Sequence, residues 1–193
     1  MNPLSAGPPS LMADARFREG FSRLAPVNLT FDAWLFHPQL GELTDLARTF
    51  PETTIVLDHV GGVLGIGAYA DKRDEVFAHW SSSMRTLASC PNVFVKLGGL
   101  GMRINGFGFE RASDPPSSEA LVTTWRPYIE TCIELFGPRR CMFESNFPVD
   151  KISYSYHVFW NACKLMAKGA SSSEKADLFA GTAARCYVLQ GIV

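Results

Sequence analysis

Four short apolar runs, each followed by a helix-like stretch, constrain the fold of this chain most strongly. The runs end at Phe36, Leu57, Leu97 and Phe143, and they are continuously apolar with few interruptions. Continuous apolar strands are typical of a parallel sheet that is covered on both faces. We therefore predict an α/β fold in which four parallel strands follow one another in sequential order with right-handed crossovers. The predicted strands are 27–36, 53–57, 92–97 and 141–143.

Apolar residues at helical spacing predict the segments that connect these strands. We expect a flexible N-terminal segment over residues 1–11 and one domain over residues 12–193. The glycine-rich stretch 98–117 is predicted to be a loop, and a loop of this length in a compact domain is more often functional than idle. The predicted helices are 12–24, 38–50, 70–88, 118–136, 154–167, 174–179 and 182–189.

Composition narrows the class of protein. A net charge of -1 gives no reason to expect binding to nucleic acid, and no apolar run approaches the roughly 20 residues of a membrane span. The first ten residues lack the basic and apolar regions of a secretory signal. The five cysteines are widely spread without a C-x-x-C motif, which indicates reduced thiols in a cytoplasmic protein.

Polar residues stand where the predicted strands end. His37 and His59 follow the first two strands, Lys96 lies one residue before the end of the third, and Glu144 and Asn146 follow the fourth. In a parallel α/β sheet the carboxyl ends of the strands share one edge, where active sites lie. We therefore expect His37, His59 and Asn146 to converge in one cleft. For each histidine, a hydrogen-bonded core position remains an open alternative.

Three common functional motifs give no support for a function in this sequence. Residues 65–70 fit G-x-G-x-x-A, but they do not follow a strand directly, and the next strand ends in Lys96-Leu97-Gly98 rather than in an acidic residue. The chain contains neither a P-loop nor a G-x-S-x-G nucleophile elbow. Ser145 is therefore a poor candidate for a triad nucleophile.

Four segments together resemble the fifth to eighth strands of the amidohydrolase-related family of TIM-barrel metal-dependent hydrolases. They are DAWLFHPQL (32–40), VLDHVGG (56–62), NVFVKLGG (92–99) and CMFESNFP (141–148). The last strand of that family ends in a pattern like FGSDWP. A complete barrel needs about 250 residues, so the resemblance implies the C-terminal half of a barrel, from about residue 12 to residue 189.

The resemblance also implies roles for individual residues. His37 matches a metal-ligand histidine, and His59 matches the histidine that polarises the substrate or shuttles protons. Asn146 stands where the family has the aspartate that serves the metal and the attacking water. The candidate substrate-binding residues are Lys96, Arg103 and Gln39.

Two departures from the family pattern bear on the metal. The chain has no H-x-H pair, which supplies two metal ligands in the family, and Asn146 carries no charge. A divalent metal such as zinc is therefore expected only in a full-length form, and weakly or not at all in this chain. Glu144 or Asp150 is an alternative carboxylate, and strand alternation would place Glu144 on the same side as Asn146.

The resemblance implies a hydrolase, lactonase-like, in which water attacks an ester or lactone of a small carboxylated substrate. His59 would polarise the carbonyl or transfer a proton, and His37 would hold a metal or the substrate carboxylate. The alternatives are a metal-dependent decarboxylase on the same scaffold and an inactive half-barrel that acts through association. Because an open half-barrel exposes strand edges, we expect residues 1–193 alone to self-associate and to hydrolyse lactones poorly.

Overall fold

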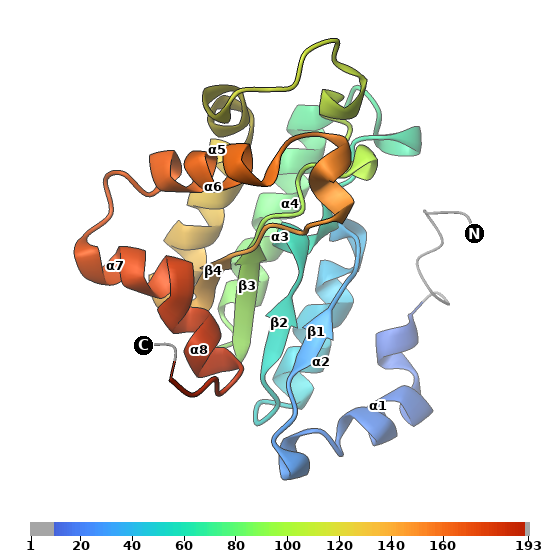
Figure 1. The fold of residues 1–193 in the computed structure, drawn as a ribbon. Coiled ribbons are helices and arrows are strands. Elements are labelled where there is room, and N and C mark those ends of the chain that lie inside the picture. Colours follow the sequence, from blue (N-terminus) through green and yellow to red (C-terminus); the bar gives the residue numbers. More distant parts are fainter. Residues whose placement is uncertain (1–9, 192–193) are drawn as a thin grey trace.

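The computed structural model describes residues 10–191, and its centre is one four-stranded sheet (Figure 1). All neighbouring strands are parallel, in the order β1-β2-β3-β4, which confirms the predicted topology. In register, Asp32 lies beside Val56, and Val56 lies beside Phe94. The strands are β1 (Phe31–Ala33), β2 (Ile55–Leu57), β3 (Val93–Leu97) and β4 (Cys141–Phe143).

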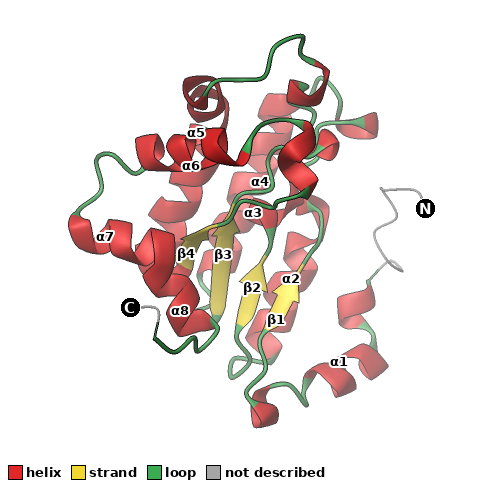
Figure 2. Cartoon of the chain, viewed as in Figure 1, coloured by secondary structure: helices red, strands yellow, loops and turns green. Residues whose placement is uncertain are grey.

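Helices and short turns connect the strands (Figure 2). The last two helices are joined by a π-helical turn, Asp177–Gly181. None of the helices in residues 10–191 combines the length and the apolar character needed to cross a membrane. The helices are α1 (Ala15–Phe21), α2 (Leu40–Thr49), α3 (His59–Gly62), α4 (Arg73–Ala88), α5 (Ser118–Phe136), α6 (Tyr156–Met166), α7 (Ser172–Ala176) and α8 (Thr182–Cys186).

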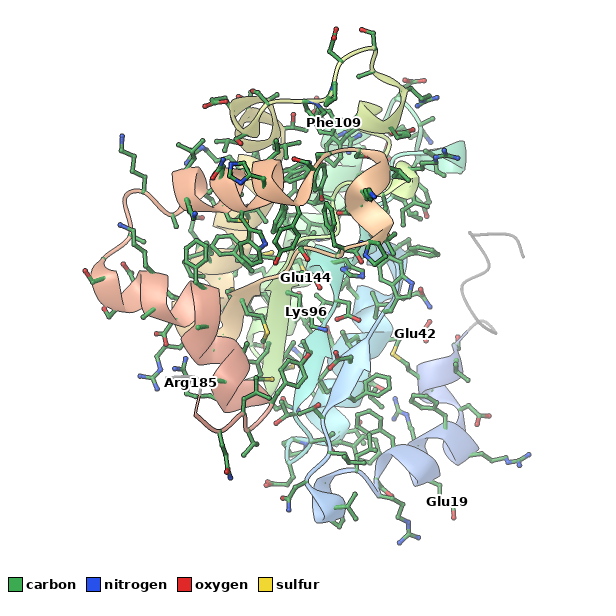
Figure 3. All side chains as sticks on the ribbon, in the orientation of Figure 1. Glu19, Glu42, Lys96, Phe109, Glu144 and Arg185 are labelled. Atoms are coloured by element: carbon green, nitrogen blue, oxygen red, sulfur yellow. The ribbon has the colours of Figure 1, made fainter. Side chains whose placement is uncertain are left out.

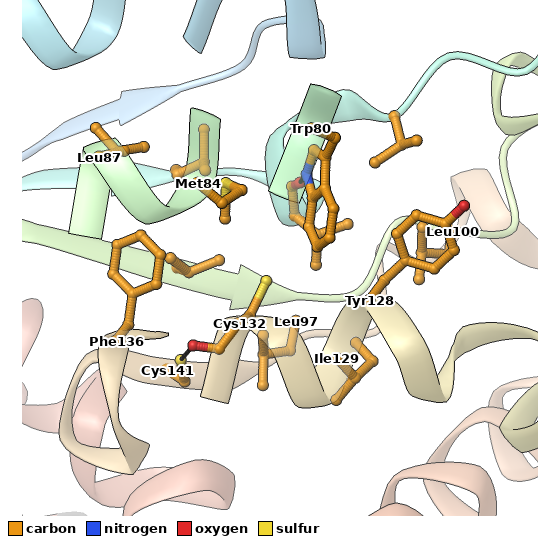
Figure 4. Close-up of a cluster of buried hydrophobic side chains, with 14 of the residues drawn as sticks. Trp80, Met84, Leu87, Leu97, Leu100, Tyr128, Ile129, Cys132, Phe136 and Cys141 are labelled. Atoms are coloured by element: carbon orange, nitrogen blue, oxygen red, sulfur yellow. Dashed lines mark hydrogen bonds between the residues drawn. The ribbon is translucent and has the colours of Figure 1, made fainter. Parts of the chain in front are cut away.

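The two faces of the sheet differ in what covers them. One face packs against α2, α4 and α5, and its core includes the fully buried Trp80 and Leu97 (Figure 4). On the other face, Met142 and Val56 pack against Cys186 from the end of α8. The C-terminal segment therefore covers part of the face that would line the inside of a closed barrel.

Several predicted boundaries are wrong for local reasons. The first strand is only Phe31–Ala33, because Ala25–Val27 forms a 3-10 turn and Asn28 takes a left-handed φ of 56°. The first helix begins only at Ala15, because the Asp14 side chain caps it.

The later helices follow the predictions more closely. Helix α5 matches the predicted range 118–136, and α4 starts three residues late because Asp71 has a φ of 60°. The predicted pair 174–179 and 182–189 is one helical run ending at Cys186. Residues 1–9 lie outside the described residues, so the flexible segment 1–11 stays a prediction.

Asn92, just before β3, ties three segments together. Its side-chain Nδ2 lies within hydrogen-bond distance of the carbonyl oxygens of Ala47 (3.2 Å), Phe50 (3.1 Å) and Thr53 (3.0 Å). These carbonyls belong to the end of α2 and the turn into β2. The half-buried amide therefore satisfies backbone acceptors where the polypeptide enters the sheet.

We predict that Asn92→Ala destabilises the chain by about 2 kcal/mol, because the carbonyl oxygens lose their donor without gaining access to water. Urea unfolding followed by circular dichroism measures this change. Ser83→Ala on α4 is the control, since Ser83 is half-exposed and its hydroxyl bonds only to its own helix; it should stay within about 0.5 kcal/mol of the parent. Equal losses in the two variants would contradict the role of Asn92.

Candidate active site

The best-defined polar contact at the carboxyl ends of the strands joins His59, after β2, to Glu144, after β4. The Nδ1 atom of His59 makes a short hydrogen bond to Oε1 of Glu144, and the backbone N–H of His59 donates to the same oxygen over 3.2 Å. The two side chains are only 15% and 17% exposed. Glu144 therefore accepts the Nδ1 proton, which leaves Nε2 of His59 unprotonated in the neutral ring.

The pair meets over the end of β3, which lies between β2 and β4. Gly98 and Gly99 occupy that end. A Cβ atom at Gly99 would lie 2.5 Å from the His59 ring, and one at Gly98 would lie 2.7 Å from Cγ of Glu144. The double glycine is therefore required by the close approach of the two side chains.

The backbone at His59 is held in an uncommon conformation. His59 and Val60 have φ values of 54° and 48°, in the left-handed region that a β-branched residue rarely adopts. The carbonyl of Val60 accepts a hydrogen bond from Nε1 of Trp80 (2.8 Å), and the N–H of Gly61 donates to the carbonyl of Asp58 (3.0 Å). Strain of this kind clusters at functional sites, where the surrounding structure maintains it.

The surroundings of His59 favour its protonated form. Burial alone would lower the pKa, but the hydrogen bond and the charge of Glu144 outweigh burial, with help from Asp58 and Asp150. The pKa of His59 is therefore raised above its ordinary value. A histidine of this kind takes up a proton readily from a nearby donor near neutral pH.

Lys96 lies between two carboxylates on the less covered face of the sheet (Figure 3). Its Nζ is 2.7 Å from Asp32 and 2.9 Å from Asp58, and the hydroxyl of Tyr187 donates to both oxygens of Asp32 at 2.9 and 3.0 Å. Burial would lower the pKa of Lys96, but the two carboxylates outweigh burial and raise it. Its charge is thus already matched, which argues against the predicted binding of a substrate carboxylate.

Asn146 is held by a buried carboxylate. Its Nδ2 donates to Asp150 over 2.8 Å, and Asp150 also accepts from the N–H of Gly101 (3.1 Å) and the hydroxyl of Tyr154. Burial raises the pKa of Asp150 despite these three donors. Because the amide NH₂ points to Asp150, the carbonyl oxygen of Asn146 is the atom left to accept a hydrogen bond. The strand ends at Phe143, so alternation does not govern these residues.

His37 is 2% exposed, and its ring lies against the segment after β2. Its Nδ1 accepts a hydrogen bond from the N–H of Leu64 (3.2 Å), and it packs against Tyr69 and His79 at ring-centroid distances of 4.9 and 5.9 Å. Burial, with a contribution from His79, lowers the pKa of His37 to about 4. Since none of these contacts links it to His59, the predicted convergence of the site histidines stays a prediction.

The residues present do not fit a metal ion. With Nδ1 of His37 accepting from a backbone N–H, the ring proton occupies Nε2, the nitrogen that a metal would need. Asn146 is uncharged, and its amide is engaged with Asp150. No group of three or more histidine, cysteine, aspartate or glutamate side chains suited to a metal occurs in the part of the chain that the structure describes.

The two remaining candidates lie in loops at the same end of the sheet. Arg103 is exposed in a 3-10 turn, Arg103–Asn105, within the long loop after β3. Oε1 of Gln39 accepts a hydrogen bond from the N–H of Phe36 (3.0 Å), so this oxygen is already engaged within its own turn. Gln39 also borders a mostly apolar cavity of about 290 Å³ with Phe36 and Tyr69. Substrate binding by Arg103 and Gln39 stays a prediction.

Neither the pairing of Glu144 with His59 nor a role for Trp34 was predicted from the sequence. Trp34 is 48% exposed, and its ring lies 4.7 Å from the ring of His59, in an edge-to-face arrangement. An acidic residue at the end of the last strand was one signal for Glu144. The adjacent glycines Gly98 and Gly99 were a second signal, because a tight approach of other residues to a strand end requires them.

Comparison with known proteins agrees with this architecture of parallel β/α units. The sequence model of the amidohydrolase family matches residues 3–189. The chain therefore belongs to the amidohydrolase family, and its four β/α units are consistent with a partial barrel.

The relatives are longer proteins. An uncharacterised protein of Sinorhizobium fredii is 38% identical over 93% of this chain and 54% of its own length. An L-fucono-1,5-lactonase of Burkholderia multivorans is 32% identical over 91% of this chain and 57% of its own. A crystal structure of a Burkholderia multivorans amidohydrolase with bound HEPES has a TM-score of 0.81 at 29% identity, covering 93% of this chain and 60% of that one. A second crystal form of it contains bound zinc. The chain thus spans between half and two thirds of the length of these proteins.

NMR titration of the four histidines tests the electrostatics of the site. We predict a pKa above 6.5 for His59 and a fall of that pKa in Glu144→Gln, because the charge that favours the imidazolium is removed. Since the folded state holds this proton more tightly, its contribution to stability is present below pH 6.5 and is lost as the pH rises through the folded pKa. Glu119→Gln, on exposed α5, is the control. An unchanged His59 pKa in Glu144→Gln would show that the pair is not coupled.

Proposed function

We propose that the chain supplies the general base of a lactone hydrolase. The observation that carries this proposal is the contact between His59 and Glu144 at the carboxyl ends of β2 and β4. A carboxylate on Nδ1 orients the ring and stabilises the imidazolium that forms when Nε2 takes a proton. The name of the 32% identical relative, an L-fucono-1,5-lactonase, supports a sugar lactone as the substrate class.

The reaction proceeds in two proton transfers through His59. Its Nε2 removes a proton from water as the oxygen of that water bonds to the lactone carbonyl carbon. The tetrahedral intermediate then expels the ring oxygen, which takes the proton back from the imidazolium, and a hydroxy acid leaves. Glu144 remains ionised throughout and holds the ring in place. The carbonyl oxygen of Asn146 is an acceptor suited to orienting the attacking water or a substrate hydroxyl.

Trp34 and Arg103 extend this proposal to substrate binding. The half-exposed indole of Trp34 beside His59 offers an apolar surface for the C–H face of a sugar ring. Arg103 is an exposed cation at the same end of the sheet and is the candidate partner for the carboxylate of the hydroxy acid that the reaction forms. Lys96 has no such role in the proposal, because Asp32 and Asp58 already hold it.

A cytoplasmic location is part of the proposal. All five cysteines are buried and free, which is compatible with a reducing compartment. Burial raises the pKa of Cys163 and Cys132, so these thiols behave as core residues rather than as nucleophiles.

Purified residues 1–193, assayed on a panel of sugar lactones by acid release, test the proposal. We predict slow hydrolysis that rises with pH, with a midpoint above 6.5, because the base must be neutral to act. His59→Asn should lower kcat about 100-fold or more, whereas Trp34→Ala should mainly raise KM. Equal hydrolysis by the parent and His59→Asn would refute the role of His59. Release of CO₂ from aromatic acids instead would support the decarboxylase alternative.

We also propose that the chain self-associates. Strands β1 and β4 each pair with only one neighbour in the described sheet, and the exposed large apolar side chains include Trp34, Val149 and Ile152. Sedimentation velocity across a hundredfold range of concentration should show dimers or larger species. Hydrolysis per chain should increase with concentration if the assembled form is the active one. A monomer at all concentrations would contradict this proposal.

A further inference from the structure

A second cavity lies at the opposite end of the sheet from the candidate active site. It has a volume of about 420 Å³, within the range of small-molecule sites. Thr54, which borders it, immediately precedes β2, and Arg140 immediately precedes β4, so the cavity lies at the amino ends of the strands. Figure 3 shows Arg185, another lining residue, far from Glu144.

Three arginines line this cavity, and only one of them pairs with a carboxylate in the described residues. Arg185 pairs with Asp177 over 2.7 Å. Arg139 and Arg140 have no carboxylate partner within residues 10–191. Glu52 is the single acidic residue that lines the cavity in that part of the chain. The lining is therefore cationic, with room for a negative charge from outside.

The side chain of Arg140 is held in place by hydrogen bonds to the backbone. Its guanidinium donates to the carbonyl oxygens of Ala88 (3.1 Å), Cys90 (2.9 Å) and Phe136 (3.1 Å). These acceptors are neutral, so they fix the group without cancelling its charge. Burial lowers the pKa of Arg140, but an arginine remains a cation in proteins.

Part of the lining is apolar. Phe94 of β3, with Leu29 and Val188, provides carbon surface beside the arginines. A site of this composition suits a molecule with an apolar body and one anionic end. Inorganic anions would satisfy the arginines but not this carbon surface.

We propose that the cavity at the amino ends of the strands binds a small organic carboxylate with an apolar body. Its carboxylate pairs with Arg139 and Arg140, and its body lies against Phe94. The site is independent of His59 and Glu144, so it does not depend on the proposed lactone chemistry.

Isothermal titration calorimetry of residues 1–193 with benzoate tests the site. We expect saturable binding of benzoate. Benzyl alcohol has the same ring without the charge, and inorganic phosphate has charge without the ring, so both should bind more weakly than benzoate. Sodium chloride at equal ionic strength controls for general screening. The proposal would be overturned if phosphate or sodium chloride gave the same binding signal as benzoate, or if benzyl alcohol bound as tightly as benzoate.

Two substitutions with opposite expected effects on the Kd for benzoate make the test specific. Arg139→Gln should raise the Kd for benzoate at least fivefold, because one charge-assisted contact is lost. Glu52→Gln should lower the Kd, because it removes the one repulsive carboxylate. Arg85→Gln is the control, since Arg85 is exposed on α4 and does not border the cavity. Both Arg139 and Glu52 are exposed, so the variants are expected to fold, which circular dichroism checks. An unchanged Kd in Arg139→Gln would overturn the proposal.

Discussion

The contact between His59 and Glu144 is the interaction on which the candidate site depends. The two residues follow strands that are not neighbours, so their side chains must meet across the end of β3. Two adjacent strand spacings amount to about 10 Å, a span that two side chains close only if the strand between them offers no obstacle. Gly98 and Gly99 provide that clearance, and the left-handed backbone at His59 directs the ring toward Glu144. Backbone conformation, glycine placement and charge pairing therefore act together.

Charge is matched differently at the two ends of the sheet. Near the carboxyl ends, Lys96 lies between Asp32 and Asp58, and Tyr187 from the C-terminal segment donates to Asp32. This arrangement neutralises charge on a partly covered surface and links the end of the chain to the first strand. At the amino ends, Arg140 is held by neutral partners, which are carbonyl oxygens and the ring of Phe136. An uncompensated cation is costly to bury, which is why a cavity beside Arg140 is a favourable place for an anion.

The half-barrel geometry explains both the coverage of the sheet and its exposure. In the described chain, Cys186 packs on Val56 and Met142, so the C-terminal residues bury part of the inner face. The family relatives are nearly twice as long as the part matched here. Trp34 remains half exposed beside His59. The same side chain is thus available to a substrate or to a second polypeptide, and the binding and sedimentation experiments distinguish these uses.

The sequence by itself determined the class of fold, the order of the strands and the family, because apolar runs, helical periodicity and motif spacing are local or ordered along the chain. It also identified His59 at a strand end. Tertiary structure alone decided which polar groups meet: Glu144 with His59, Asp150 with Asn146, and two aspartates with Lys96. Those pairings join residues whose side-chain directions depend on backbone turns after the strands end, such as the positive φ of Asn146. Strand alternation does not extend into such turns, so sequence spacing alone did not determine which polar groups would pair.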